Sequence, residues 1–540
     1  MSFRHSTDFF LIKDTQLFTY GWGFSDEHET LSVTLVLHFT AGEISEEIGV
    51  EFGKDRGDVK QVFGTDNSLN SGYLAIAGFG NRALARVDLC WQFSNGSGHV
   101  ISVFSESESR KSIQLSPKVA TLNFGFMWRK VIATLRELGI KATFRKILLY
   151  SKGRPKASHE ELKFALSDSL NKPKVAMVID HDMGGGANIY RKAQVEELKQ
   201  KGQFVIFLGF HVASLSYFIE IEVGGKAQRF VLDQLSSLFT LIANLNLVAI
   251  YYNCAVSFRR PLDVVKLMID LKRIKGAELI VSIHDYFIVC PSQFLLDDSG
   301  EFCGVPELSK CKECLPNHKD GWVSLAGTRD IVFWRAQWEQ LIKIADTVKV
   351  FSNSSVRLLT RAFGTETTKS FVVLPHALPE KPLVANLSAG DQLRIGVVGS
   401  IGRHKGAAVV AELANEILKS NLPIKIVVVG TIDVKVPSAV VQVLGSYRPR
   451  DLPNLLRESG VNIVLFPSLL AETFSYVANE LIAMKVPFVC FDVGAQADLA
   501  REYDNGLVLA SHEPAFVLEE MDGFWRRLYQ TNHRFAPPLH

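Results

Sequence analysis

The sequence predicts an α/β protein in which two doubly wound domains follow an N-terminal β-sandwich and an amphipathic helical linker. Three observations favour this fold class. Residues 1–112 contain short segments in which apolar and polar side chains alternate. From residue 171, near-continuous apolar strands alternate with helical segments, and the same rhythm restarts at Leu393. Apolar strands with intervening helices are typical of a parallel sheet that is buried on both faces.

The composition describes a packed globular chain with several domains. Its 540 residues exceed one core, and 47% hydrophobic with 21% charged residues is typical of folded proteins. A formal net charge of +2 argues against nucleic acid as a main partner. The first residues, MSFRHSTDFFLIKD, contain no apolar signal core. We therefore expect a cytoplasmic chain that is either soluble or peripheral on the inner face of the cytoplasmic membrane.

Residues 1–112 are predicted to form the β-sandwich, which would act as a glycan-binding or assembly module. Two segments, SVTLVLHF and RVDLCWQF, place every second side chain on one apolar face: Val33, Leu35, Leu37 and Phe39 in the first, and Val87, Leu89, Trp91 and Phe93 in the second. Glycine-rich turns such as SNGSG separate these segments, as in all-β domains.

Residues 113–170 are predicted to form a basic amphipathic helical linker. Between Lys118 and Lys156, ten Lys or Arg residues face one acid, Glu137. Apolar residues recur there at helical spacing: Phe124, Trp128, Val131, Ile132, Leu135 and Leu138. Such a segment is either a linker helix packed on its neighbours or a helix that lies on an anionic membrane leaflet.

Residues 171–385 and 386–540 are predicted to form the two doubly wound domains, the second with a C-terminal helix. Ligands of such sheets bind beyond the carboxyl ends of the strands. In the first domain this place is taken by HDMGGGANIY, where Gly184, Gly185 and Gly186 precede a helix whose N-terminus could receive a phosphate or an acceptor. The loop is not a G-x-G-x-x-G fingerprint, which disfavours a nicotinamide or flavin cofactor, and a simple tight turn is the alternative.

Two segments of the second domain combine charges with the ends of strands. GSIGRHKGAAVV carries Arg403 and Lys405 before a helix, where cations would stabilise a departing diphosphate. AETFSYVANELIA places Glu472 at the start of a predicted helix and Glu480 about two turns later on it. An unpaired carboxylate is costly to bury, so a ligand is the better explanation for acids in an apolar run.

These segments resemble the retaining glycosyltransferases with two Rossmann-like domains, the GT-B architecture. The resemblance is to the large bacterial polysaccharide-biosynthesis family (glycosyltransferase family 4-like), and it covers residues 172–525. It rests on the Glu-x7-Glu signature in PSLLAETFSYVANELIA, on VGSIGRHKG, in which Lys405 follows Gly399 by six positions, and on HDMGGGANIY.

The resemblance implies the roles of individual residues. In the family the first glutamate contacts hydroxyls of the donor sugar and the second binds ribose, which carries over to Glu472 and Glu480. A histidine similar to His284, after the strand IVSIHDY, touches the transferred sugar, whereas a structural histidine is the alternative. Ser400 stands where the family usually has arginine. The implied catalytic residues are His284, Arg403, Lys405 and Glu472, and the implied donor-binding residues are Gly399, Ser400, Arg403, Lys405, Glu472, Thr473, Phe474, Ser475 and Glu480.

Four cysteines in a predicted insertion, residues 286–318 of the first doubly wound domain, have metal-like spacing. Cys311 and Cys314 form a CxxC pair, and Cys290 and Cys303 precede them. Four thiolates suit a tetrahedral structural zinc, with packed thiols or disulfides as alternatives. No cofactor is expected for catalysis itself.

The leading functional hypothesis is therefore a hexosyl- or deoxyhexosyltransferase that uses a nucleoside-diphosphate sugar. Its acceptor would be a growing, lipid-linked surface glycan such as the O-antigen of lipopolysaccharide or a capsule chain, in contact with the inner-membrane surface and other polysaccharide-assembly proteins. The alternatives are a nucleotide-sugar epimerase on the same fold and a non-catalytic glycan- or nucleotide-binding protein.

Overall fold

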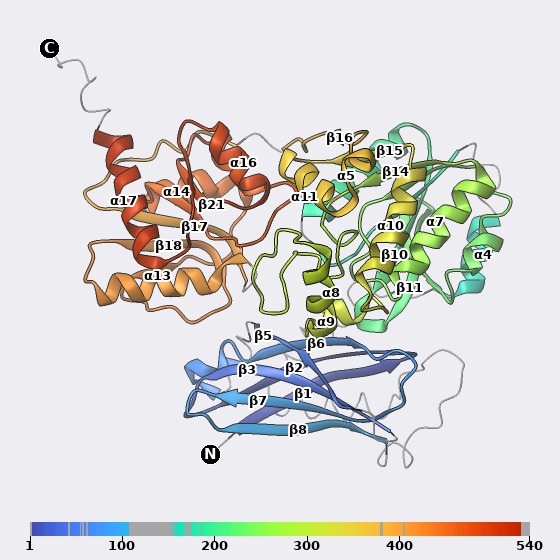
Figure 1. Cartoon of the computed structure of the whole chain (residues 1–540), viewed down its shortest axis with the longest axis horizontal. Coiled ribbons are helices and arrows are strands. Elements are labelled where there is room, and N and C mark those ends of the chain that lie inside the picture. Colours follow the sequence, from blue (N-terminus) through green and yellow to red (C-terminus); the bar gives the residue numbers. More distant parts are fainter. Residues whose placement is uncertain are drawn as a thin grey trace. The chain divides into compact units, whose positions relative to one another are not determined.

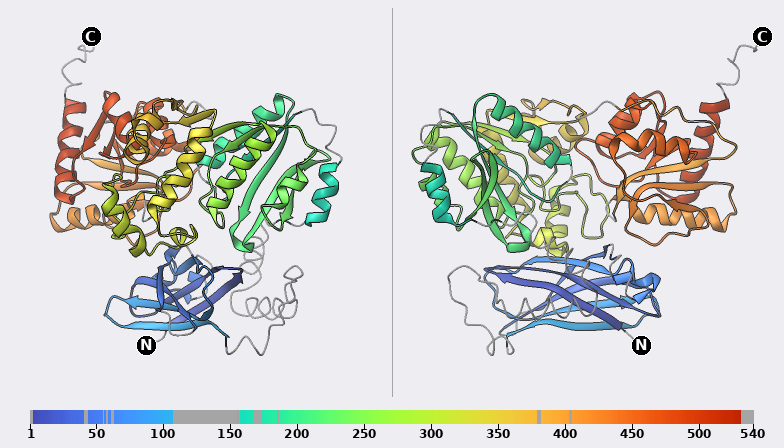
Figure 2. Two further views of the ribbon diagram at one scale, coloured as in Figure 1. Left: turned by 45° about the vertical axis from the view of Figure 1, so that its right-hand side comes forward. Right: turned by 180° about the vertical axis from the view of Figure 1, so that it is seen from behind.

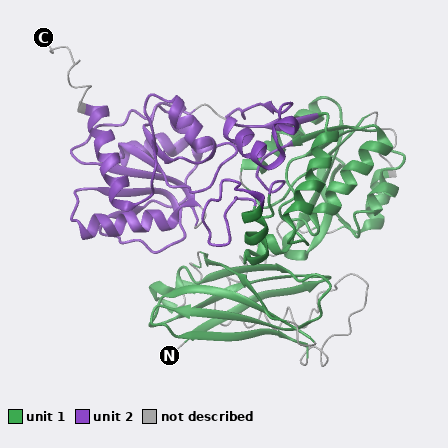
Figure 3. Cartoon of the chain, in the orientation of Figure 1, with its two compact units in different colours: residues 1–281, 290–292, 309–346 green, residues 282–289, 293–308, 347–540 purple. Residues whose placement is uncertain are grey.

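The computed structural model describes residues 3–40, 44–54, 56, 59–60, 63–106, 155, 157–167, 174–184, 186–378, 382–402 and 405–530. The chain divides into two compact units (Figure 3). Unit 1 comprises residues 1–281, 290–292 and 309–346, and unit 2 comprises residues 282–289, 293–308 and 347–540. The division between the units differs from the predicted boundary at 385/386, because residues 347–385 belong to unit 2 together with the C-terminal sheet. The β-sandwich belongs to unit 1.

The N-terminal region of unit 1 is a sandwich of two antiparallel four-stranded sheets, drawn in blue in Figure 1. The sheet orders are β1-β2-β6-β5 and β4-β3-β7-β8. All eight residues of the two predicted alternating faces lie in the core between the sheets. The strands are β1 (Phe3–Lys13), β2 (Gln16–Ser25), β3 (Thr30–Phe39), β4 (Glu46–Gly49), β5 (Glu51–Lys54), β6 (Gly72–Gly78), β7 (Leu84–Phe93) and β8 (Gly98–Ser105).

Most of the predicted basic linker, 113–170, lies outside the described residues. Its described part contains the helix α4 (His159–Ser167). A reciprocal capping box starts this helix: Ser158 N donates to Glu161 Oε2 at 2.6 Å, and Glu161 N donates to Ser158 Oγ at 3.2 Å. The amphipathic pattern around Trp128 therefore stays a prediction.

The doubly wound part of unit 1 is a mixed sheet with strand order β12-β11-β10-β9-β13-β14. The strands β10, β9, β13 and β14 run parallel to one another, whereas β11 is antiparallel to β10 and forms an edge hairpin with β12. The hairpin turn, Gly224-Gly225, has positive φ at both residues, as a tight two-residue turn requires. The sequence predicted a purely parallel sheet, and the antiparallel strands β11 and β12 make it a mixed one. The elements are β9 (Val175–Ile179), α5 (Gly186–Gln200), β10 (Phe204–His211), β11 (Ser216–Val223), β12 (Lys226–Leu232), α6 (Ser237–Leu241), β13 (Leu247–Tyr252), α7 (Pro261–Lys275), β14 (Glu278–Ser282), α8 (Leu308–Asn317), α9 (Gly321–Ser324) and α10 (Ile331–Ile344).

The short helix α9 joins the sandwich to the rest of unit 1. Its N-cap, Asp320, accepts main-chain hydrogen bonds from Trp322 and Val323. Gly49 N donates to Lys319 O at 2.7 Å, and Gly78 N donates to Ser324 Oγ at 2.9 Å. These hydrogen bonds make the sandwich a packed part of unit 1.

Unit 2 contains a six-stranded parallel sheet with the order β19-β18-β17-β20-β21-β22 (Figures 1 and 2). Alternate residues of each strand point to opposite faces: Ile395 and Val397 belong to the core under α13 and α17, and Val398 to the core under α14, α15 and α16. The elements of unit 2 are β15 (Thr347–Val350), α11 (Asn353–Phe363), α12 (Thr365–Thr368), β16 (Val372–Val373), β17 (Arg394–Ile401), α13 (Ala407–Lys419), β18 (Lys425–Ile432), β19 (Val441–Val443), α14 (Leu452–Glu458), β20 (Ile463–Phe466), α15 (Tyr476–Ala483), β21 (Phe488–Phe491), α16 (Gly494–Glu502), β22 (Gly506–Leu509) and α17 (Pro514–Gln530).

The predicted fold class is therefore confirmed: an antiparallel β region precedes two α/β sheets. Within the described residues, none of the helices has the length and apolarity that crossing a bilayer requires.

Candidate functional site

The candidate site of unit 2 lies where the strand order of the parallel sheet reverses. The neighbours β17 and β20 are separated in sequence by β18 and β19, which lie on one side, while β21 and β22 lie on the other. The carboxyl ends of strands at such a switch point are where open α/β sheets bind ligands. Gly399 and Ser400 lie inside β17 near this end, and Ser400 Oγ accepts a hydrogen bond from Thr431 at 3.1 Å.

Lys405 lies on the loop that leads from β17 into α13. Its main-chain N donates to Gly402 O at 2.9 Å, and the next residue, Gly406, adopts a left-handed conformation with φ of 83°. A Cβ on Gly406 would lie 1.9 Å from Pro467 O, so only glycine allows this loop to meet the segment after β20. The side chain of Lys405 is exposed. The predicted cation Arg403 lies outside the described residues.

Glu472 lies on the segment after β20 and within electrostatic reach of Lys405. Burial raises the pKa of the Glu472 carboxyl, and the charge of Lys405 and a hydrogen bond with Ser475 oppose that shift. The site thus combines an exposed cation with a largely buried acid from the ends of neighbouring strands.

The start of α16 holds the Glu472 segment in place. Gln496, which is fully buried, donates to Leu470 O at 2.6 Å and accepts from Glu472 N at 3.3 Å. Ala495 N donates to Glu472 O at 2.8 Å. A Cβ on Gly494 would lie 2.5 Å from Glu472 N, so this approach also requires glycine. The sequence contained no signal for Gln496, since it contacts main chain and not a ligand.

The predicted start of the helix that follows Glu472 was wrong. The helix α15 begins at Tyr476, and its N-cap is Ser475, whose Oγ accepts a hydrogen bond from Ala478 N. Glu472, Thr473 and Phe474 therefore belong to the preceding loop. The capping signal of Ser475 was present in the sequence and marks the observed start.

Glu480 is the fifth residue of α15 and lies near Tyr447. Burial raises the pKa of Glu480. Burial, and then the charge of Glu480, raise the pKa of Tyr447 to about 12. A half-buried carboxylate beside an un-ionised phenol can accept hydrogen bonds from a neutral polyol.

His284 joins the site through main chain. Thr473 Oγ1 donates to His284 O at 2.9 Å, and both residues belong to unit 2. The His284 ring stacks on Phe351 with ring centroids 4.6 Å apart. The structure thus places the predicted histidine next to the Glu472 loop.

His376, which sequence analysis missed, lies at the centre of an aromatic cluster around this histidine. Its ring is 5.3 Å from His284, 3.9 Å from Phe351, 4.7 Å from Phe474 and 5.6 Å from Tyr476, measured between centroids. Burial lowers the pKa of His376 to about 4, so its ring is neutral near pH 7. A single histidine in VLPHALP gives no periodic or spacing signal, which is why the sequence did not indicate it.

The predicted glycine loop of unit 1 is held by helix α5. Gly184 has φ of 91° and donates to Asn188 Oδ1 at 2.6 Å, and α5 begins at Gly186. Arg191 donates to His181 O at 2.5 Å. Gly185 lies outside the described residues. The loop precedes a helix N-terminus as predicted, but it belongs to the other compact unit.

The four cysteines of the predicted zinc site are divided between the units. Cys290 and the α8 residues Cys311 and Cys314 belong to unit 1, and Cys303 belongs to unit 2. None of the seven cysteines forms a disulfide. Across the described residues these four do not form a group whose ligand atoms converge within 4.8 Å. A zinc ion on them stays a prediction.

A protein-family model matches the region of the C-terminal sheet. Residues 392–524 match the family described as glycosyl transferases group 1. The match includes Gly399, Lys405, Glu472 and Glu480, and it confirms the prediction of a glycosyltransferase. No curated protein sequence matches the chain.

The solved structures that the chain resembles have low sequence identity to it. HepE from Anabaena, in complex with UDP and glucose, is 15% identical, with 64% of this chain and 89% of that one covered and a TM-score of 0.38. The lipopolysaccharide outer core galactosyltransferase WaaB is 10% identical, with 66% and 91% covered and a TM-score of 0.41. A mutant of S. aureus TarM in complex with UDP is 11% identical, with 66% and 93% covered and a TM-score of 0.37.

The raised pKa of Glu472 predicts that its charge destabilises the unliganded chain. Its usual pKa is 4.5, and the folded value lies above it, so the native state holds the proton more tightly. The stability that the protonated form contributes is present below 4.5 and is lost as the pH rises through the folded pKa. Glu472→Gln should therefore raise the free energy of unfolding by about 1 kcal/mol near pH 8 and leave it nearly unchanged near pH 4.

Urea unfolding at both pH values measures this difference. Glu458→Gln, an exposed position on α14, is the control and should be neutral at both. A Glu472→Gln chain that is less stable than the native one near pH 8 would contradict a carboxylate whose charge is costly to bury.

Proposed function

We propose that the chain is a retaining glycosyltransferase that moves a sugar from a nucleoside-diphosphate sugar onto a growing, lipid-linked bacterial surface polysaccharide. The observation that carries the proposal is the electrostatic interaction of Lys405 with Glu472 at the switch point of the parallel sheet. The family match over residues 392–524 supports the same chemistry.

Lys405 has the position that a leaving diphosphate needs. It is exposed, and it lies directly before the N-terminus of α13, where main-chain N–H groups have no helical partner. Negative charge develops on the diphosphate as the glycosidic bond breaks. A fixed cation and a helix N-terminus stabilise that charge more in the transition state than in the ground state.

The two glutamates would hold the neutral parts of the donor. Glu472 lies within electrostatic reach of Lys405, so a sugar attached to the diphosphate would meet its carboxylate. A carboxylate can accept hydrogen bonds from sugar hydroxyls. Glu480 and Tyr447 lie together on the α15 side of the site, and we assign the ribose diol to them. A bound donor would thus supply hydrogen bonds to acids whose burial limits their solvation.

His284 would touch the transferred sugar from the opposite side of the Glu472 loop. Its main chain is fixed by Thr473 and its ring by Phe351 and His376. An imidazole held in this way can hydrogen-bond a primary hydroxyl of the sugar.

Retention follows if the acceptor oxygen attacks the anomeric carbon on the face that the diphosphate leaves. The new carbon–oxygen bond forms as the bond to the phosphate oxygen breaks, and the acceptor's proton passes to that phosphate oxygen. This step needs no protein nucleophile. It needs the positioning and charge stabilisation that Lys405 and Glu472 supply.

The acceptor side of the proposal concerns the basic segment and the sandwich. A lipid-linked O-antigen or capsule precursor is presented at the inner leaflet of the membrane, and ten basic residues between Lys118 and Lys156 would attract the chain to its anionic surface. The sandwich, joined to unit 1 through α9, would serve as a glycan-binding or assembly module.

Removal of the ribose contact should weaken nucleotide binding. Glu480→Ala is expected to raise the Kd for the cognate nucleoside diphosphate about tenfold, because hydrogen bonds to a charged group contribute about 1.5–3 kcal/mol. Titration calorimetry after a screen of nucleotide sugars for released diphosphate measures this, with Glu458→Ala as the matched control.

Each alternative function has its own outcome in this experiment. Unchanged affinity in Glu480→Ala would contradict the ribose assignment. Nucleotide binding without release of diphosphate from any donor would favour a binding protein, and epimerised donor without an acceptor would favour an epimerase.

Removal of positive charge from the basic segment should weaken membrane binding. Arg129, Lys130 and Arg136 changed together to Gln should reduce binding to anionic vesicles by about 1 kcal/mol for each charge. Co-sedimentation with vesicles of anionic and of neutral lipid measures it. A variant with Gln at the exposed Lys192, Lys226 and Lys312 of unit 1 is the control. Equal losses in both variants would show that only overall charge matters.

A further inference from the structure

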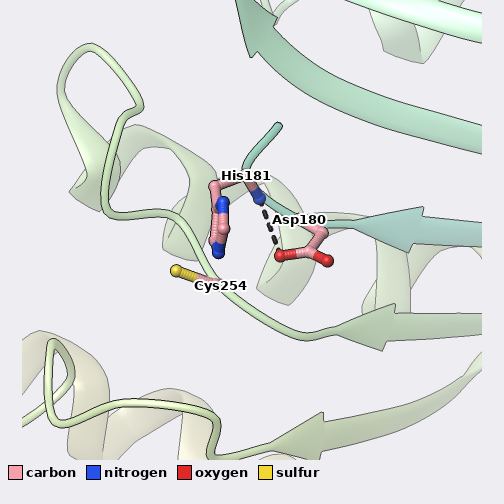
Figure 4. Close-up of side chains that lie close together, drawn as sticks. All are labelled: Asp180, His181 and Cys254. Atoms are coloured by element: carbon pink, nitrogen blue, oxygen red, sulfur yellow. Dashed lines mark hydrogen bonds between the residues drawn. The ribbon is translucent and has the colours of Figure 1, made fainter. Parts of the chain in front are cut away.

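Three buried side chains with metal-ligating atoms converge at the carboxyl edge of the unit 1 sheet. They are Asp180, His181 and Cys254, and their potential ligand atoms all lie within 4.8 Å of one another. Figure 4 shows them coming from the ends of two strands: Asp180 and His181 from β9, and Cys254 from β13. Across the described residues, no other group of three or more such side chains is this close.

The parallel register of the sheet brings them together. Ile179 of β9 lies opposite Tyr252 of β13, and the ladder continues with a hydrogen bond of 2.9 Å from Asn253 N to Ile179 O. Asp180 directly follows Ile179, and Cys254 directly follows Asn253. Both are fully buried. The proximity is therefore fixed by main-chain pairing and not by side-chain rotation alone.

A second layer of contacts orients the three groups. Asn188 of α5 donates to His181 O at 2.9 Å and lies 3.4 Å from Asp180 Oδ2, while its Oδ1 accepts from Gly184 N. The carboxylate also accepts from His181 N at 2.8 Å. Metal sites typically have ligands held in this way by partners that do not touch the ion.

The charged side chains around the three groups have a net negative charge, which favours a bound cation. Three carboxylates face two guanidinium groups: Asp180, Asp182 and Glu220 against Arg191 and Arg229, with Arg191 Nη1 3.8 Å from Asp180 Oδ2. The sum is one negative charge. A divalent ion together with a deprotonated Cys254 would bring it to zero, which a buried site favours.

We propose that Asp180, His181 and Cys254 form a zinc site. One sulfur, one nitrogen and one oxygen ligand suit Zn²⁺, whereas Ca²⁺ and Mg²⁺ require mainly oxygen ligands. Three protein ligands leave the fourth tetrahedral position for water or another small oxygen ligand. The site is distinct from the Lys405–Glu472 site and from the four cysteines of residues 286–318.

Metal binding would change one hydrogen bond of the His181 ring. Met183 N donates to Nδ1 at 3.1 Å, and coordination through Nε2 would move the ring proton to Nδ1 and open this bond. Met183 is exposed, so water can replace the lost partner. The proton lost from Cys254 passes to solvent, and binding should weaken as the pH falls.

Cobalt titration of the untagged full chain tests the proposal. After removal of metal with a chelator, Co²⁺ should produce a thiolate-to-cobalt charge-transfer band that saturates at a single equivalent, and Zn²⁺ should abolish it. Cys254→Ser should lose the band, and His181→Gln should weaken cobalt binding by at least about 100-fold. Circular dichroism shows whether each variant is folded.

Two further variants make the outcome specific. Cys90→Ser, in the sandwich strand β7, should keep the band, and Cys311→Ser, in α8, should keep it as well. The absence of a saturable band in the native chain would overturn the proposal. A band that survives in Cys254→Ser and disappears in Cys311→Ser would also overturn it, because the metal would then belong to the CxxC segment.

Discussion

The close approach of Gly406 to the carbonyl of Pro467 is the constraint on which the candidate active site depends. It brings the loop after β17 against the segment after β20, at the point where the strand order of the sheet reverses. Lys405 precedes this glycine, and Glu472 follows Pro467 by five residues, so the contact sets a cation beside an acid. Gly494 and Gln496 hold the same segment from the side of α16.

The site is built at a cost to the unliganded chain. Burial raises the pKa of both Glu472 and Glu480, which means that water solvates these carboxylates poorly. A polyol ligand would supply the missing hydrogen bonds. The ring of His376 packs against Phe351, Phe474 and Tyr476, which places an aromatic cluster next to the Glu472 loop. The proposed donor binding would account for acids at these positions.

Sequence reasoning predicted the features that have a period or a spacing. The alternating faces around Leu35 and Leu89, the two α/β sheets and the carboxyl-end positions of Lys405 and Glu472 follow from patterns of apolar residues and glycines. It missed contacts between segments distant in sequence. The predicted start of α15 was too early, because the helix begins only after its N-cap Ser475. The edge hairpin β11–β12 was not predicted. Gln496 and His376 act through tertiary packing, and the convergence of Asp180, His181 and Cys254 depends on strand register, so no local pattern could indicate them.

A structure of the chain crystallised with its nucleoside diphosphate tests the central claim most directly. The account predicts the diphosphate beside Lys405 and the N-terminus of α13, the ribose diol within hydrogen-bond distance of Glu480, and the Glu472 carboxylate facing the open side of the terminal phosphate. A nucleotide bound at the glycine loop of unit 1, or a Glu472 side chain directed away from the phosphates, would contradict it.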